Sequence, residues 1–94
     1  MIRALLASGL AATLSSCSHL VVLHDPLSAA ERCYRSALHD RPADPDAMNN
    51  LAVVLLRQGK SLEEAESLAS RAVAADQADS SYRATLEEVQ QARR

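Results

Sequence analysis

The sequence predicts an all-α protein, and three observations support this prediction. Of the 94 residues, 48% are apolar, 23% are charged and 2% are aromatic, which is typical of one small helical domain. Two glycines and three prolines are too few for the dense turns of an all-β fold. Apolar residues also recur every three or four positions between Leu27 and Val89, which is the period of amphipathic helices. We therefore expect a short array of about four helices.

The overall charge of the chain argues against one class of partner. The formal net charge is −2 and the sequence pI is near 5.8. Nucleic-acid binding depends on clustered lysines and arginines that neutralise phosphates. We therefore predict no nucleic-acid partner.

Residues 1–16 have the layout of a secretory signal peptide. Arg3 provides a positive charge, an apolar run extends from Ala4 to Leu14, and two serines precede Cys17. The apolar run is too short to cross the ~30 Å hydrocarbon core of a bilayer as a helix. We expect this segment to be removed. Ordinary cleavage near the serines, and retention as an anchor or core helix, remain alternatives.

The end of this segment, Leu14-Ser15-Ser16-Cys17, resembles the lipobox of bacterial lipoproteins. In that motif the cysteine is acylated before the preceding peptide bond is cut. The resemblance implies a mature chain that begins at Cys17 and is anchored by several fatty chains such as palmitate. Ser18 stands where an aspartate typically retains such proteins in the inner membrane. This implies an outer-membrane protein facing the periplasm, with the inner membrane as the alternative.

After the signal peptide we predict a tether over residues 17–26 and a helical domain over residues 27–94. The middle of the tether, Leu20-Val21-Val22-Leu23, is apolar, so we expect it to pack onto the domain. If Cys17 is acylated, Cys33 is the only remaining thiol and no intrachain disulfide forms. We expect Cys33 to be a small buried residue, with an intermolecular disulfide as the alternative.

Capping patterns predict where the first helix begins. Asp25-Pro26 offers a capping side chain followed by a proline that suits a first helical position. Ser28 and Glu31 form a second candidate start, the Ser-x-x-Glu capping box. The helix should end within residues 41–45. Its apolar face is expected to consist of Leu27, Ala30, Cys33, Tyr34, Ala37 and Leu38.

Similar signals predict three further helices. The second should run from about Pro45 to Gln58 and stop at Gly59. Ser61 and Glu64 predict a capping box for the third helix, and Asp79 can cap the fourth. The expected apolar faces are Met48, Leu51, Ala52 and Leu55 in the second helix, Leu62, Ala65, Leu68, Ala69, Ala72 and Val73 in the third, and Tyr82, Leu86 and Val89 in the fourth.

The chain is also similar to itself. A shift of 35 residues superposes Leu27 on Leu62 and Ala30 on Ala65, and it likewise superposes Tyr34 on Ala69, Ala37 on Ala72 and Leu38 on Val73. Such a period resembles the tetratricopeptide repeat, a helix-turn-helix unit of about 34 residues. The residues that carry this resemblance are Asn50, Leu51, Ala52, Leu55, Gly59, Glu64, Ala65, Ala69 and Ala72.

The resemblance implies a partial repeat over residues 27–41, a full repeat over 45–79 and a capping helix over 80–94. The chain departs from the pattern at three positions. Ser61 is an extra residue in the turn, Gln77 replaces a closing proline, and Glu87 stands where a small residue is usual. A generic helix bundle with alanine-rich contacts remains the alternative.

Catalytic and metal-binding signals are weak. No nucleophile is paired with a base at a recognisable spacing. Cys33 and His39 are six residues apart, so they lie about 240° apart around a helix and cannot share one metal. The acidic side chains are expected to be solvated at turns and helix starts; they are Asp44, Asp46, Glu63, Glu64 and Glu66. We predict no enzymatic activity, no cofactor and no metal.

The resemblance to tetratricopeptide repeats implies a binding groove lined by the first helix of each repeat. Val53 and Leu56 beside two carboxamides favour a partly apolar partner helix. Packing of both residues against the first helix or the tether is the alternative. The predicted groove residues are Asn49, Asn50, Val53, Leu56, Arg57, Ala84, Thr85 and Glu88.

Together these features predict an outer-membrane lipoprotein that binds a protein or peptide helix and helps to assemble an envelope complex. This prediction rests on analogy at the level of the fold. Two alternatives stay open: a structural lipoprotein that associates with itself as a homo-oligomer, and a non-catalytic accessory subunit of an envelope enzyme.

Overall fold

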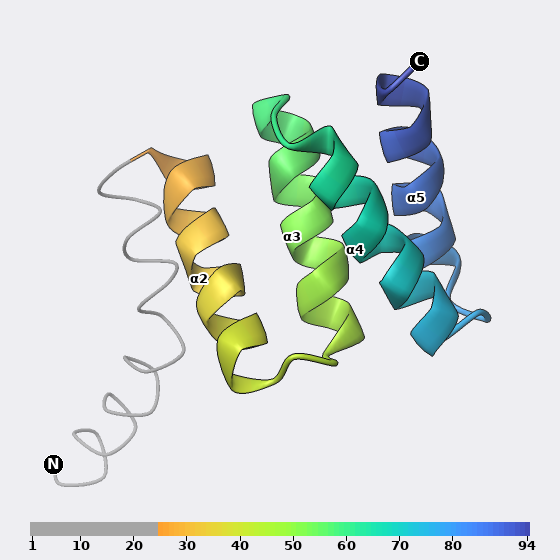
Figure 1. Ribbon diagram of the computed structural model, residues 1–94, viewed down its shortest axis with the longest axis horizontal. Coiled ribbons are helices and arrows are strands. Elements are labelled where there is room, and N and C mark those ends of the chain that lie inside the picture. The colour runs from red at the N-terminus through yellow and green to blue at the C-terminus, as the bar shows by residue number, and fades with distance from the viewer. Residues whose placement is uncertain (1–24) are drawn as a thin grey trace, which may run out of the picture.

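The computed structural model describes residues 25–94, which form four helices and no strand. The helices are α2 (Pro26–Asp40), α3 (Pro45–Gln58), α4 (Leu62–Ala75) and α5 (Ser80–Ala92) (Figure 1). The predicted all-α array is confirmed, and the predicted ends of the second helix coincide with those of α3. The predicted signal peptide, the lipobox-like residues and most of the tether lie outside the described residues.

The four helices form an open array (Figure 1). α3 contacts α2, α4 and α5, and α4 also contacts α5, whereas α2 and α5 do not touch each other. In a closed four-helix bundle every helix would border a common core. The absence of a contact between α2 and α5 therefore supports stacked helical units over a generic bundle.

The core lies between α3, α4 and α5. Its members are the apolar faces that the helical spacing predicted: Met48, Leu51, Ala52, Leu55, Ala65, Leu68, Ala69, Ala72, Tyr82 and Val89. Alanines at the α3–α4 crossing are fully buried and allow the two backbones to approach, while Leu51 and Leu55 fill the adjacent space. On α2 the predicted face is only half-buried, and the fully buried residue is Ala29. The expectation for Cys33, a small buried thiol, is wrong, because Cys33 is half-buried and disulfide-bonded.

Aspartate side chains begin three of the helices. Asp44 Oδ1 accepts hydrogen bonds from the backbone N–H groups of Asp46 (3.0 Å) and Ala47 (3.4 Å). Asp25 and Asp79 cap α2 and α5 in the same way. Gly59 ends α3 with φ of 67°, a left-handed conformation that suits glycine. The predicted caps at Asp25 and Asp79 and the stop at Gly59 are confirmed.

The two predicted Ser-x-x-Glu boxes are wrong. Ser61 stands at the N-cap of α4, but its side chain makes no capping hydrogen bond because its backbone is left-handed, with φ of 50°. The extra residue in this turn is thus accommodated by an unusual backbone conformation. At α2, Ser28 Oγ donates to Asp25 Oδ2 (2.7 Å), so Asp25 is the cap and Glu31 turns elsewhere.

Candidate protein-binding face

α3 and α5, which would be the first helices of successive repeats, lie in contact. Most of the predicted groove residues lie at the surface of these helices. Those on α3 are half-buried, namely Asn49, Asn50, Val53 and Leu56, apart from the exposed Arg57. On α5, Ala84 and Glu88 are exposed and Thr85 is buried.

Two of these residues face inward. Thr85 is 6% exposed, and its Oγ1 donates a hydrogen bond to the carbonyl of Ser81 (3.1 Å). Leu56 packs against the core cluster. Thr85 therefore supports the helix, and Leu56 can offer a partner only the part of its side chain that remains outside. Val53 and Ala84 are the apolar side chains of the set that lie outside the core cluster.

A hydrogen bond between side chains joins α3 to α5. The Tyr82 hydroxyl donates to Asp46 Oδ1, at the start of both helices. Hydrogen bonding to the Asp46 carboxylate raises the pKa of Tyr82 to about 12. Because the tyrosine ring is also part of the core, this contact holds the two helices in a fixed relation. The sequence placed Tyr82 correctly in the core but gave no signal for its partner.

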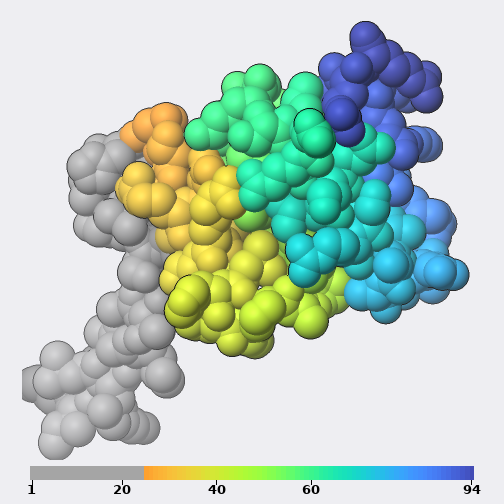
Figure 2. All heavy atoms as spheres, in the orientation of Figure 1, coloured from red at the N-terminus to blue at the C-terminus, as the bar shows by residue number. Residues whose placement is uncertain are grey.

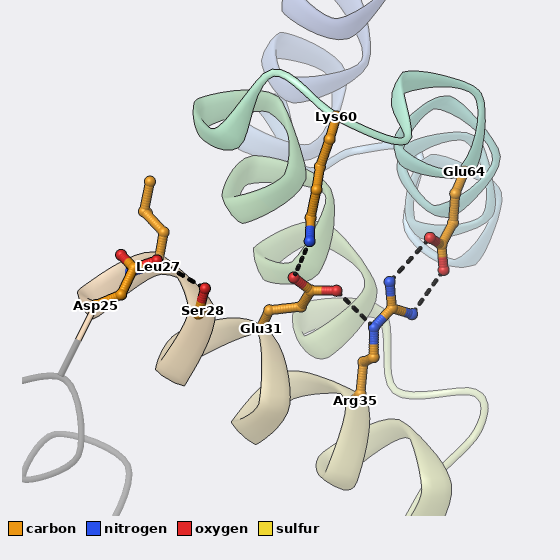
Figure 3. Close-up of polar contacts among 7 residues, drawn as sticks. All are labelled: Asp25, Leu27, Ser28, Glu31, Arg35, Lys60 and Glu64. Carbon is orange, nitrogen blue, oxygen red and sulfur yellow. Dashed lines mark hydrogen bonds and ion pairs between the residues drawn. The ribbon is translucent and has the colours of Figure 1, made fainter.

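A cluster of four charged side chains joins α2 to α4 (Figure 3). Arg35 donates to Glu31 on its own helix (2.9 Å) and forms two hydrogen bonds to Glu64 on α4 (2.7 and 3.0 Å). Lys60 completes the cluster, with its Nζ 3.1 Å from Glu31. The atoms of α2 and α4 meet on the face shown in Figure 2.

The same cluster explains the shifted titration of its members. Hydrogen bonding to Arg35 holds the pKa of Glu64 below its usual range. The pKa of Glu31 is also lowered, mainly by the hydrogen bond from Arg35 and next by the one from Lys60. The bidentate bond to Glu64 raises the pKa of Arg35. The i, i+4 spacing of Glu31 and Arg35 was a signal for the first pair. The pairing with Glu64 depends on the fold.

The acidic residues are therefore less solvated than expected. Glu64 binds Arg35, and Glu66 accepts a hydrogen bond from Gln90 Nε2 (3.3 Å) and pairs with Arg93 at the end of α5. Asp44 caps α3 and Asp46 binds Tyr82. Of the five acidic residues expected to be solvated, Glu63 alone is exposed and makes no hydrogen bond or ion pair through its side chain among the described residues.

The described residues bring together no set of metal ligands. Over residues 25–94, no three histidine, cysteine, aspartate or glutamate side chains gather in one place. His39 is exposed, with its nearest acidic neighbour Asp40 at 3.6 Å. None of the four helices has both the length and the apolar character that crossing a membrane requires.

Comparison with known proteins agrees with the helical architecture. Residues 22–80, more than half of the chain, match the sequence profile of the tetratricopeptide repeat. No match was found among curated proteins or among solved structures. The matched range includes all of α2, α3 and α4 and ends at the first residue of α5. The repeat period, the open array and the profile match lead to one conclusion: the chain belongs to the tetratricopeptide-repeat family.

Proposed function

We propose that this protein is a lipoprotein adaptor, anchored through Cys17 to the outer membrane and facing the periplasm, that binds a protein partner on the α3–α5 face. Tetratricopeptide repeats are typically non-catalytic modules that hold a peptide or a helix. The lipobox-like residues Leu14 to Cys17 support the anchor. The partner belongs to an envelope complex that the adaptor helps to assemble.

The contact between α3 and α5, held by Tyr82 and Asp46, carries the binding proposal. On these two helices, Val53, Asn49 and Asn50 of α3 are half-buried and Glu88 of α5 is exposed. An apolar side chain next to carboxamides suits a partner helix with one apolar edge and a few polar groups. Arg57 and Glu88 add opposite charges, which favour one orientation of a polar partner.

The anchor is tested by metabolic labelling with a fatty-acid probe in intact bacteria. The wild-type chain should take up the label, fractionate with the outer membrane and begin at residue 17. Cys17→Ala should accumulate as an unlabelled precursor, because the thiol is the acylation point. An unlabelled wild-type chain with a different mature terminus would show that the anchor is absent.

Binding is tested by crosslinking in intact cells followed by purification of the tagged chain. Val53→Asp should reduce the yield of a specific crosslinked partner by about tenfold or more, because burying an unpaired carboxylate at an interface is unfavourable. Ser67→Asp, on the exposed face of α4, is the matched control and should leave the yield unchanged.

Two results would contradict the adaptor function. An equal loss of crosslinked partner in Val53→Asp and Ser67→Asp would show that the partner does not bind specifically at Val53. A crosslinked product that contains only this chain would favour the self-associating lipoprotein instead. Circular dichroism of both variants confirms that their helices are intact.

A further inference from the structure

The turn between α3 and α4 contains a serine in the left-handed region of backbone conformation. Ser61 has φ of 50° and ψ of 42°, whereas the N-cap residue of a helix usually has an extended backbone. The left-handed conformation costs free energy in any residue that has a Cβ atom. The Ser61 side chain also makes no capping hydrogen bond, although Ser61 and Glu64 have the spacing of a capping box. A contact outside the turn is therefore needed to stabilise this conformation.

Charged residues on both sides of Ser61 contact α2 (Figure 3). Lys60 precedes Ser61, and its Nζ lies 3.1 Å from Glu31. Glu64 lies in the first turn of α4, and its two carboxylate oxygens accept hydrogen bonds from Arg35 (2.7 and 3.0 Å). The backbones of α2 and α4 are not in contact, so Arg35 and Glu64 span the distance between these helices. The contacts that can stabilise the turn are therefore those to α2.

The Glu64 carboxylate has two competing uses that require different directions of its side chain. In a capping box, the glutamate turns back to the backbone N–H of the N-cap serine, whose hydroxyl accepts a hydrogen bond from the glutamate N–H. In this structure, both oxygens of Glu64 point instead to the guanidinium of Arg35. A partly exposed ion pair and a helix cap contribute free energies of similar size. Neither arrangement is therefore strongly favoured over the other.

We propose that Glu64 is a switch that couples the docking of α2 to the capping of α4. In the docked state, Glu64 binds Arg35, and Ser61 is left-handed and uncapped, as in this structure. In the released state, Arg35 leaves Glu64, the Ser61 backbone becomes extended and the Ser61–Glu64 capping box forms. The new cap offsets part of the lost ion pair. The core between α3, α4 and α5 is retained in both states, because none of these three residues belongs to it.

The switch responds to anything that competes for Arg35. A carboxylate on a partner protein would take the place of Glu64, and a high salt concentration would screen the pair. In both cases, a change at the surface of α2 alters the backbone of the turn between α3 and α4. The switch requires neither acylation of Cys17 nor a partner on the α3–α5 face, so it does not depend on the proposed adaptor function.

Nuclear magnetic resonance of the full chain in detergent tests the switch, with Arg35→Gln as the variant that releases Glu64. The backbone chemical shifts of Ser61 should indicate a left-handed residue in the wild-type chain and an extended one in Arg35→Gln. The Glu64 amide should exchange its hydrogen about fivefold more slowly in Arg35→Gln, because it gains an acceptor. Arg93→Gln is the matched control, since it removes an ion pair to Glu66, farther along α4, and should change neither signal. A left-handed Ser61 in Arg35→Gln, or the same changes in Arg93→Gln, would overturn the proposal.

A double-mutant cycle with Ser61→Ala tests the same coupling through stability. Alanine cannot accept a capping hydrogen bond, so Ser61→Ala should leave the folding equilibrium constant of the uncapped wild-type chain nearly unchanged. In the Arg35→Gln background, it should lower that constant by about fivefold, because a cap is then lost. Urea denaturation followed by circular dichroism measures all four chains. Independent substitutions have additive effects, so an equal effect of Ser61→Ala in the two backgrounds would also overturn the proposal.

Discussion

α3 and α5 occupy equivalent places in the repeat but differ in their surroundings. Both begin with an aspartate cap, Asp44 and Asp79, and both bury apolar residues at matching positions. The pairs that match in this way are Ala47 and Tyr82, and Val54 and Val89; the buried Leu51 is matched by the half-buried Leu86. At three positions that are buried in α3, the character changes from apolar to polar: Met48 to Arg83, Ala52 to Glu87, and Leu55 to Gln90.

The number of neighbouring helices explains this difference. α3 contacts three helices, and the side of α3 that bears Met48, Ala52 and Leu55 is buried. α5 contacts only α3 and α4 among the described helices, and Arg83 and Glu87 are exposed. A repeat helix with a polar outer side ends a stack, because a further helix would have to bury those charges. Substitutions at equivalent positions should therefore reduce the stability of the fold more in α3, inside the array, than in α5, at its end.

The largest expected effect comes from Leu55→Ala compared with Gln90→Ala. Leu55 is 0% exposed, so its truncation should reduce the free energy of unfolding by about 2–5 kcal/mol through lost burial and a residual cavity. Gln90→Ala, at the matching position of α5, should change it by about 0.5 kcal/mol. Urea denaturation followed by circular dichroism measures both. Similar losses would mean that α5 is an interior helix.

Ala52→Leu and Glu87→Leu form a second pair. Ala52 is fully buried at the α3–α4 crossing, and a larger side chain should cost about 1–3 kcal/mol of stability by overpacking. Ala65→Leu, on the other side of the crossing, should behave in the same way. Glu87→Leu adds the same side chain on the exposed side of α5 and should leave the melting temperature nearly unchanged. An unchanged melting temperature for both Ala52→Leu and Ala65→Leu would contradict a close contact between α3 and α4 at these alanines.

The N-caps of α4 and α5 provide a third comparison. Ser61 has a left-handed backbone and makes no capping hydrogen bond, so Ser61→Gly should increase stability by up to about 1 kcal/mol. Asp79 accepts hydrogen bonds from Ser81 (2.9 Å) and Tyr82 (3.3 Å) N–H groups, and Asp79→Gly should not be stabilising. Chemical denaturation of the two variants decides the matter. A loss of stability in Ser61→Gly would indicate that the serine hydroxyl has a role in the turn.

Arg35→Gln should have the smallest effect at neutral pH, about 0.5–1 kcal/mol, because the ion pairs of Arg35 are partly exposed. Its pH dependence is more informative. The pKa values of Glu31 and Glu64 are lowered in the folded chain, so their contribution is complete above 4.5, the ordinary glutamate value, and is lost as the pH falls below it.

The stability difference between the wild-type chain and Arg35→Gln should therefore shrink between neutral pH and about pH 3. Arg71→Gln is the control, because Arg71 donates to the Pro42 carbonyl (3.3 Å), which does not titrate in this range. Urea denaturation at both pH values measures the two differences. A constant difference for Arg35 would show that its guanidinium acts by packing and not through the carboxylates.

The sequence by itself determined most of the local structure. The spacing of apolar residues predicted the buried faces of α3, α4 and α5, and Asp25, Gly59 and Asp79 marked helix ends that the structure confirms. These features depend on residues that are close together in the chain, so period and capping chemistry are enough to predict them. The 35-residue period also predicted that the helices would stack as repeats.

Only the tertiary structure decided which charged and polar side chains meet. The bond from Arg35 to Glu64 crosses 29 positions, and that from Tyr82 to Asp46 crosses 36. Such pairs form where helices that are distant in sequence are brought together, and no local pattern encodes their distance. Ser61 is a related case, because its residue type predicted a cap but its backbone is left-handed and its side chain makes no capping hydrogen bond. The same reason applies to Thr85, which the groove analogy placed on the surface and the packing of α5 buries.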